Sequence, residues 1–212
     1  MTRTHRNICA ICGINTATTL DHLPPKSIFP RPRPNNLITV PSCKECNQNA
    51  SILDEAFRLY LALHVVRQGD EATKKYFQEA LKTFEHNGRL QREIINNSQP
   101  IDCTTESGIY LGQGMKVTWN STAHDAVIER IVRGLYYHHF GEVLPPQAKV
   151  FPKWFSEPNE EFLQTMNDLT KNIIGNNQFV YFYGRSENDP TKSVWYFEFY
   201  GQHWAGAHTG MD

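Results

Sequence analysis

The stretches Cys9-Ala-Ile-Cys12 and Cys43-Lys-Glu-Cys46 decide the fold of the N-terminal part of this 212-residue chain. The two-residue gap in each stretch lets one tight turn present both thiolates to the same metal ion, and four thiolates complete the tetrahedral shell of a structural zinc. We therefore expect Cys9, Cys12, Cys43 and Cys46 to bind one zinc ion, which would stabilise a small fold with too little core of its own. The alternative interpretation is four buried thiols that bind no metal.

The composition is that of an ordinary globular protein, with 40% hydrophobic and 20% charged residues. No run of about 18 apolar residues occurs, so no transmembrane helix and no membrane partner are expected. Residues 1–6 are polar and basic with no apolar stretch after them, which argues against a signal peptide. These features predict a cytoplasmic protein, in which cysteines bind metals or stay as thiols rather than form disulfides.

Positive charge is concentrated at the N-terminal end, although the net charge of the whole chain is −1. Residues 1–50 contain six basic and two acidic side chains, whereas residues 101–212 contain eight basic and thirteen acidic ones. Because phosphate binding depends on local lysine and arginine, any nucleic-acid-binding face should lie in the N-terminal part. Chance clustering of charge is the alternative.

The apolar pattern predicts an α+β chain in three parts, which are residues 1–54, 55–100 and 101–212. Five prolines between positions 24 and 34 exclude a regular helix there and predict an extended loop. Helices are expected from about residue 51 to 66 and across residues 76–84. Turns or a linker are expected at 87–88 and 96–100.

The third part is expected to be an α+β body of unknown role. Short strands are predicted at 109–111 and 115–119, and helices at 123–140, capped by Ser121 or Thr122, and at 160–174. Two aromatic-rich segments, residues 179–183 and 194–200, flank a polar turn and predict an antiparallel hairpin. We expect their aromatic side chains to form a packed sheet core, with a base-stacking platform as the alternative.

Asp21, His22 and Asn47 carry the chemistry that the sequence suggests. The Asp21 carboxylate and the Asn47 amide offer the hard oxygen ligands that magnesium and manganese prefer. Adjacent strand residues point to opposite faces, so His22 can take a proton from an attacking water without competing for the metal. A metal held in this way would stabilise charge on the leaving 3′ oxygen of a phosphodiester. Taken singly, the three residues could be a turn residue, a surface or core histidine and a helix cap.

Residues 8–54 resemble the HNH endonucleases of the ββα-metal, treble-clef type. The shared pattern is a cysteine knuckle, Asp21-His22-Leu-Pro-Pro-Lys, Asn36-Leu, and a second knuckle followed directly by Asn47. The resemblance implies that Asp21 and Asn47 bind the catalytic magnesium or manganese and that His22 is the general base. It also implies that Asn36 braces the loop between the two strands. A phage junction-resolving endonuclease of this family has the same Cys-x-x-Cys-Asn ending.

The sequence departs from that family pattern in its loops. Asp21 follows Cys12 by nine residues, and the proline-rich stretch 24–34 replaces the glycine-containing hairpin of many members. Asn35 precedes Asn36, so either could take the middle position, although the leucine that follows favours Asn36. These departures affect the loop details more than the assignment of the site.

The sequence therefore predicts a metal-dependent HNH endonuclease that hydrolyses phosphodiester bonds, with DNA as the expected substrate. Lys26, Arg31 and Arg33 are the expected phosphate contacts, and a merely solvated side chain is the alternative at each. Cutting both strands with one site per chain would favour a homodimer. The competing hypothesis is a non-catalytic, zinc-stapled module that binds nucleic acid or protein.

A few other polar residues are given structural roles. Asp54 and Glu55 are interpreted as acids in the N-terminal turn of a helix, favoured by its dipole, with support of the metal site as the alternative. His138 and His139 are interpreted as structural or surface residues, and Cys103 as an ordinary thiol.

Overall fold

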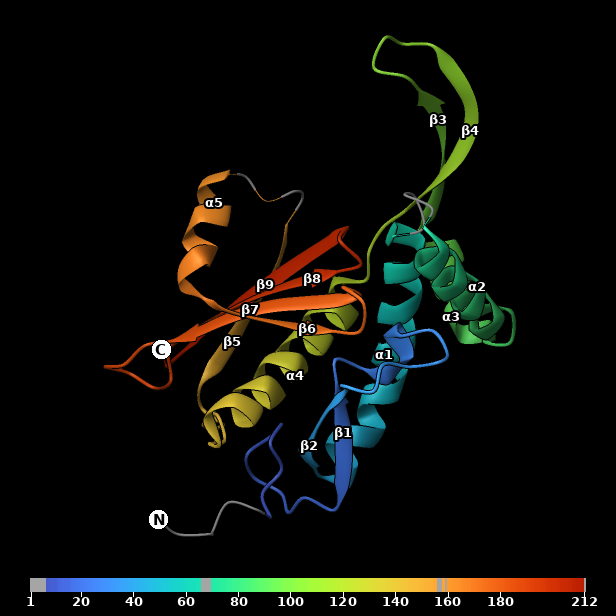
Figure 1. The fold of residues 1–212 in the computed structure, drawn as a ribbon. Helices are drawn as coiled ribbons and strands as arrows, with labels where there is room; N and C mark the ends of the chain where they lie inside the picture. Colours follow the sequence, from blue (N-terminus) through green and yellow to red (C-terminus); the bar gives the residue numbers. More distant parts are fainter. Residues whose placement is uncertain (1–6, 66–69, 156–157, 159, 212) are drawn as a thin grey trace.

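The computed structural model describes residues 7–65, 70–155, 158 and 160–211, and it has a mixed α+β fold (Figure 1). The N-terminal part contains strands β1 (Thr19–Leu23) and β2 (Ile38–Ser42), the short 3-10 helix η1 (Lys26–Ile28), and helix α1 (Lys44–Val65). β1 and β2 pair antiparallel, with Asp21 opposite Val40. Apart from η1, the proline-rich segment that joins the two strands has no regular structure, as its composition predicts.

Helix α1 begins at Lys44, well before the residue 51 that the apolar spacing indicates. Its first turn contains the second cysteine knuckle, where the Asn47 amide donates to the Cys43 carbonyl oxygen at 3.1 Å. This first turn is polar and buries no large apolar side chain, so hydrophobic spacing could not show where the helix starts. The interpretation of Asp54 and Glu55 as acids of a first helical turn is therefore wrong, because both lie well inside α1.

Two shorter helices follow, and α2 packs against α1 while α3 packs against α2. α2 (Glu71–Glu85) confirms the second predicted helix, and the Asp70 carboxylate caps it by accepting from the Thr73 amide at 2.7 Å. α3 (Gly88–Asn96) lies where only turns were expected. The reason is that Asn87, which suggests a turn, caps α3 by accepting a backbone N–H of its first turn.

Strands β3 (Ser98–Thr104) and β4 (Tyr110–Val117) form a two-stranded ribbon, the arm, which projects away from the body of the molecule (Figure 1). The short strands predicted on either side of residues 112–114 are parts of the single strand β4, and β3 takes the place of part of the expected linker. The register of the ribbon shifts near the tip of the arm, where Cys103 pairs with Gly112 and Thr104 with Tyr110, so that Leu111 is the bulged residue of β4.

Helix α4 (Ser121–Phe140) confirms the helix predicted at 123–140 and lies along one face of the C-terminal sheet (Figure 1). Its cap is Asn120, whose side chain accepts from a first-turn amide at 3.0 Å, rather than Ser121 or Thr122. The helix ends at Gly141, whose φ of 68° lies in the left-handed region that glycine adopts without strain.

Close packing of α4 on β1 depends on Gly134. A Cβ atom added at Gly134 would collide with the Leu23 side chain at the end of β1. The missing side chain lets the helix lie directly on the strand, and Arg130, one turn earlier on α4, thereby reaches Asp21 of the same strand.

The C-terminal sheet has five antiparallel strands in the order β5-β9-β8-β7-β6. They are β5 (Lys149–Phe155), β6 (Thr170–Ile174), β7 (Phe179–Arg185), β8 (Ser193–Phe199) and β9 (His203–Gly210). β7 and β8 form the predicted aromatic hairpin, with Tyr181 opposite Phe197. Most of its aromatic side chains are buried in the core, as expected, and do not form an exposed platform.

The helix predicted at 160–174 is wrong in its second half. α5 (Glu160–Thr165) and a short 3-10 turn (Met166–Asp168) are followed by β6, in which Ile173 pairs with Val180 of β7. β-branched residues and pairing with β7 favour a strand there. A search for helical periodicity does not detect such a tertiary contact.

One cluster of buried side chains extends through the N-terminal part, α1, α4 and the C-terminal sheet. Phe57 of α1 packs edge-on against Phe199 of β8, with ring centroids 5.6 Å apart. The zinc-type cysteines and the sheet therefore belong to one packed body. Within the described ranges, no helix combines the length and apolar character needed to cross a membrane.

Candidate functional site

The four knuckle cysteines converge on one point and can bind a zinc ion. Their Sγ atoms all lie within 4.8 Å of one another, with Cys9 and Cys43 buried and Cys12 and Cys46 partly buried. Burial and the neighbouring cysteines raise the pKa of Cys46, so four thiolates cannot share this space without a cation. The chemistry of this donor set fits zinc, which binds thiolates in tetrahedral shells.

Backbone and side-chain N–H groups support the sulfur atoms. The Cys46 amide donates to Cys43 Sγ at 3.4 Å, and the Asn15 amide donates to Cys12 Sγ at 3.5 Å. Gly13 makes the tight turn of the first knuckle possible, because its φ of 68° is left-handed. Hydrogen bonds to sulfur favour the thiolate, which is the form that binds a metal.

A polar pocket of about 390 Å³ lies beside this cluster, between β1, η1, α1 and α2. It brings together four of the residues that the sequence singles out, which are Asp21, His22, Lys26 and Asn47. The other lining residues are Leu20, Pro25, Ser27, Ser51, Asp54, Glu55, Arg58 and Thr83.

The amide of Asn47 is held in a defined orientation at the start of α1. Its Nδ2 donates to the Thr19 hydroxyl at 3.1 Å and to the Leu20 carbonyl oxygen at 3.2 Å. Because a carbonyl oxygen can only accept, the Asn47 nitrogen must face β1. The Asn47 Oδ1 atom therefore faces away from that carbonyl and can serve as a ligand.

Asp21 is buried, with 7% of its surface exposed, and only one of its two carboxylate oxygens is hydrogen-bonded. Oδ1 accepts from the His22 amide at 2.9 Å, whereas Oδ2 has no hydrogen-bond partner. Oδ2 lies 3.3 Å from Arg130 Nε, which is itself buried without a hydrogen bond. Burial raises the pKa of Asp21, although the nearby Arg130 charge and the His22 amide oppose this shift.

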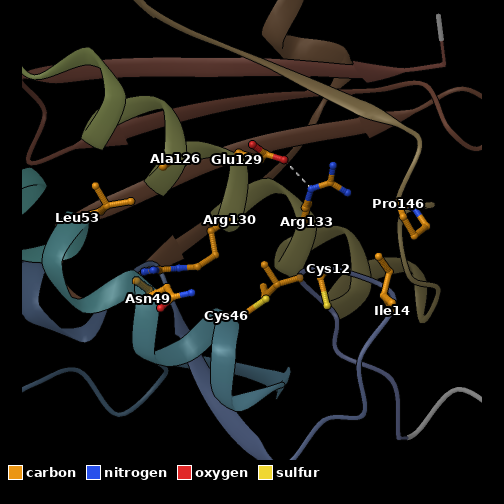
Figure 2. Close-up of a pocket in the computed structure, with 12 residues that line it drawn as sticks. Cys12, Ile14, Cys46, Asn49, Leu53, Ala126, Glu129, Arg130, Arg133 and Pro146 are labelled. Atoms are coloured by element: carbon orange, nitrogen blue, oxygen red, sulfur yellow. Dashed lines mark hydrogen bonds and ion pairs between the residues drawn. The ribbon is translucent and has the colours of Figure 1, made fainter.

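Arg130 reaches this carboxylate from α4 and also binds Asp54 of α1. Its Nη2 donates to Asp54 Oδ1 at 2.5 Å, and its side chain is 7% exposed. Burial raises the pKa of Asp54 to about 6 even though the Arg130 charge opposes the shift. One guanidinium thus lies between a buried and a half-buried carboxylate, and Figure 2 shows it extending from α4 toward α1.

His22 is partly exposed at the mouth of the polar pocket. Burial lowers its pKa, the charges of Lys26 and Arg33 lower it further, and the Asp21 carboxylate opposes the shift. The imidazole is therefore neutral near pH 7, which is the form that can accept a proton.

Two of the predicted site residues lie away from the pocket. The Asn36 side chain donates to the Ile173 carbonyl oxygen at 3.0 Å and accepts from the Gly175 amide at 3.1 Å. These contacts tie the loop before β2 to the C-terminal sheet. Arg31 is exposed, and its backbone amide donates to Glu79 of α2 at 3.0 Å.

Arg33 lies beside the pocket without lining it. Its Nε donates to the Lys26 backbone carbonyl oxygen at 3.1 Å, and the charges of Lys26 and Arg33 both act on His22. The structure thus groups Lys26 and Arg33 and separates Arg31 from them.

Sequence reasoning missed Arg130 and Arg58 as members of the site and assigned Asp54 to another role. Asp54 could have been found, because Asn47, Ser51 and Asp54 follow at helical spacing and share one face of α1. Arg130 is 76 residues away from Asp54 in sequence and carries no local signal.

A second, more apolar pocket of about 400 Å³ lies next to the cysteine cluster, between α1 and α4 (Figure 2). Cys12, Cys46 and Leu53 line it together with Glu129 and Arg133 of α4, which form an ion pair at 2.8 Å. Arg130 connects the two pockets, because it lines the second one and forms ion pairs with Asp21 and Asp54 of the first.

Comparison with known proteins identifies no relative of this chain. No family model matches it, and no curated protein or solved structure is significantly similar.

Proposed function

We propose that this protein is a metal-dependent endonuclease of the HNH type. The observation that carries the proposal is the meeting of Asp21, His22 and Asn47 in one polar pocket next to four clustered cysteines. These residues come from a strand, strand, helix unit in the order that the HNH resemblance implies. Asp21 and His22 come from β1, and Asn47 comes from the first turn of α1, directly after the last cysteine.

Asp21 and Asn47 are the residues that would hold the divalent metal. Asp21 Oδ2 is a buried carboxylate oxygen that has no hydrogen-bond partner and faces Arg130 Nε at 3.3 Å, and Asn47 Oδ1 is turned away from β1. Two hard oxygen donors of this kind suit magnesium or manganese. When bound, such an ion would stabilise negative charge on the scissile phosphate and the leaving oxygen.

His22 would act as the general base. A neutral imidazole at the mouth of the pocket can take the proton of an attacking water, and its pKa is lowered by burial and by Lys26 and Arg33. Lys26 and Arg33 would contact phosphates on the same edge, and Arg58 lines the pocket from α1. Their charge supports binding of a polyanion, for which DNA is the substrate we propose.

A non-catalytic zinc-stapled binding module is the second candidate, and Arg130 favours it. The guanidinium already neutralises Asp21 and Asp54 without any metal, as a purely structural ion triad would. In that case the polar pocket would be a structural feature, and the basic side chains alone would bind nucleic acid.

Cleavage of a supercoiled plasmid distinguishes the two candidates. Zinc-loaded protein should cut in magnesium or manganese and not in their absence, and His22→Ala should slow cutting by about 10²–10⁴-fold, the usual contribution of a general base. His86→Ala is the matched control, because His86 is exposed at the end of α2 and should have no effect. Equal inactivity of wild type and His22→Ala on duplex, single-stranded and RNA substrates, with zinc bound, would favour the binding module.

A further inference from the structure

The arm exposes an unusual amount of apolar surface for a two-stranded ribbon. Ile109, Tyr110 and Leu111 follow one another with exposed fractions of 63%, 59% and 66%, and Met115 on the same strand is 61% exposed. A lone two-stranded hairpin is marginally stable in water, and runs of exposed apolar residues are found where a partner covers them. The described part of the chain does not cover these side chains.

Charge argues against nucleic acid as the partner of the arm. The ribbon Ser98–Val117 carries Asp102 and Glu106 but only one basic residue, Lys116 near its base. A ribbon that enters a DNA groove needs basic side chains to neutralise the phosphates around it. The arm therefore fits a protein partner.

The two edges of the arm differ in their capacity to add another strand. β3 contains Pro100, which has no N–H to donate and is the residue type that blocks edge pairing. β4 contains no proline, and among the described residues it pairs only with β3. The outer edge of β4 is therefore the edge available for pairing.

The sequence of β4 is complementary to itself when read in the opposite direction. Around Gln113 as a centre, Gly112 matches Gly114, Leu111 matches Met115, and Tyr110 matches Lys116. Ile109 and Val117 continue the match one position further out. An antiparallel pair related by a two-fold axis brings such positions opposite each other, and any isologous interface requires this kind of self-match.

We propose that β4 pairs antiparallel with β4 of a second copy of this chain, with the two-fold axis at Gln113. Leu111 then lies opposite Met115 of the partner subunit, and the two ribbons form a continuous four-stranded sheet. The long stem of Lys116 packs beside the Tyr110 ring of the partner subunit, as amphipathic side chains do.

Pairing along the β4 edge brings the exposed apolar side chains of the two arms beside each other on the faces of the shared sheet, where each covers part of its neighbour. The backbone N–H and C=O groups on the outer edge of β4 gain hydrogen-bond partners in the same step.

Sedimentation velocity of the full zinc-loaded chain tests the pairing. Wild type should sediment as a dimer at micromolar concentration, and Leu111→Lys combined with Met115→Lys should weaken the dimer at least tenfold, since it buries like charges opposite each other. Ile52→Lys is the matched control, because Ile52 is a 53% exposed apolar residue on α1. A monomeric wild type, or a dimer that the arm variants leave unchanged, overturns the proposal. So does a monomer whose DNA binding is weakened by Leu111→Lys, because the arm would then contact nucleic acid.

Cross-linking tests the register. In a Cys103→Ser background, Gln113→Cys places two thiols directly across the two-fold axis, where mild oxidation should join the chains. Lys116→Cys is the control, since position 116 lies opposite position 110 and should not cross-link. No covalent dimer from Gln113→Cys, or equal cross-linking from both variants, contradicts the register centred on Gln113.

Discussion

Replacing Arg130 by methionine removes the only charge that the structure places between Asp21 and Asp54 in the described part of the chain. The substitution keeps most of the side-chain volume on α4 but leaves buried Asp21 and half-buried Asp54 without the guanidinium that they share. Asp21 is 7% exposed, and the Asp54 side chain is 20% exposed. Neither group can recover full hydration without opening the contact between α1, α4 and β1.

The size of the effect follows from the distances. A unit charge pair at the 3.3 Å separation of Arg130 Nε and Asp21 Oδ2 is worth about 5 kcal/mol at an effective dielectric constant near 20. The Asp54 contact at 2.5 Å is at least as strong, but desolvation of three charges offsets most of the gain. Breaking such a buried group from one side costs about 3–5 kcal/mol, which is the loss of unfolding free energy that we expect.

Urea unfolding of the zinc-loaded protein at neutral pH measures this loss. Adding Asp54→Asn to Arg130→Met should recover a large part of it, because a neutral amide removes one of the two unpaired charges. Arg133→Met is the matched control on the same helix. It loses the Arg133 bond to the Ala148 carbonyl oxygen, worth about 1.5–3 kcal/mol, and the ion pair with the half-exposed Glu129, but it leaves no buried carboxylate behind.

The pH dependence has a definite sign. The pKa of Asp54 is about 6 in the folded protein and is raised by burial, so the folded state binds a proton more tightly than the unfolded chain. Losing Arg130 raises this pKa further, and the variant should therefore regain stability relative to wild type as the pH falls from 7.5 to 5. An unfolding free energy within about 1 kcal/mol of wild type at pH 7.5 would refute the reasoning, since a buried ion pair broken from one side costs more than that.

Three further predictions concern zinc, phosphate binding and pH. Wild type should contain one zinc per chain by elemental analysis, and Cys46→Ser should lose it together with the cooperative unfolding of the N-terminal part; an unchanged zinc content contradicts the assigned ligands. Lys26→Gln or Arg33→Gln should lower the slope of log DNA affinity against log salt by about one phosphate contact, whereas Arg31→Gln, away from the pocket, should change it less. Burial and two neighbouring histidines lower the pKa of His203 well below 6.5, so the unfolded chain binds a proton that the folded chain does not. The free energy of unfolding should therefore decrease as the pH falls below about 6.5, by up to about 1.4 kcal/mol per pH unit. His203→Gln should remove that part of the slope, and identical slopes for the two proteins contradict the assignment.

Much of the candidate site could be predicted because its signals are local. The sequence itself shows two pairs of cysteines separated by two residues, and an Asp-His pair shortly before a proline. The four cysteines cluster in the structure, and Asp21, His22 and Asn47 line one pocket. The contacts of Asn36 could not be predicted, because its partners are backbone groups of β6 and the turn after it, more than 130 residues away.

The errors in the fold have the same origin. Helical spacing predicts a helix at 170–174, whereas β6 forms there because it pairs with β7, which lies later in the chain. The turn-type composition of residues 96–100 predicts a linker, whereas β3 begins at Ser98 because it pairs with β4. The start of α1 was missed because metal-type ligands, rather than apolar residues, define its first turn. Arg130 shows the same limit at the site, since its two carboxylate partners come from different elements far away in sequence.

The central claim is that Asp21 and Asn47 hold one divalent cation beside His22, and manganese binding tests it most directly. Electron paramagnetic resonance of free Mn²⁺ titrated with the zinc-loaded chain should reveal one bound ion per chain, lost in Asp21→Asn and weakened in Asn47→Ala. Asn49→Ala is the matched control, because Asn49 lies on α1 and lines the second pocket instead. Binding that is absent in wild type, or equal in wild type and Asp21→Asn, would contradict the metal-dependent mechanism.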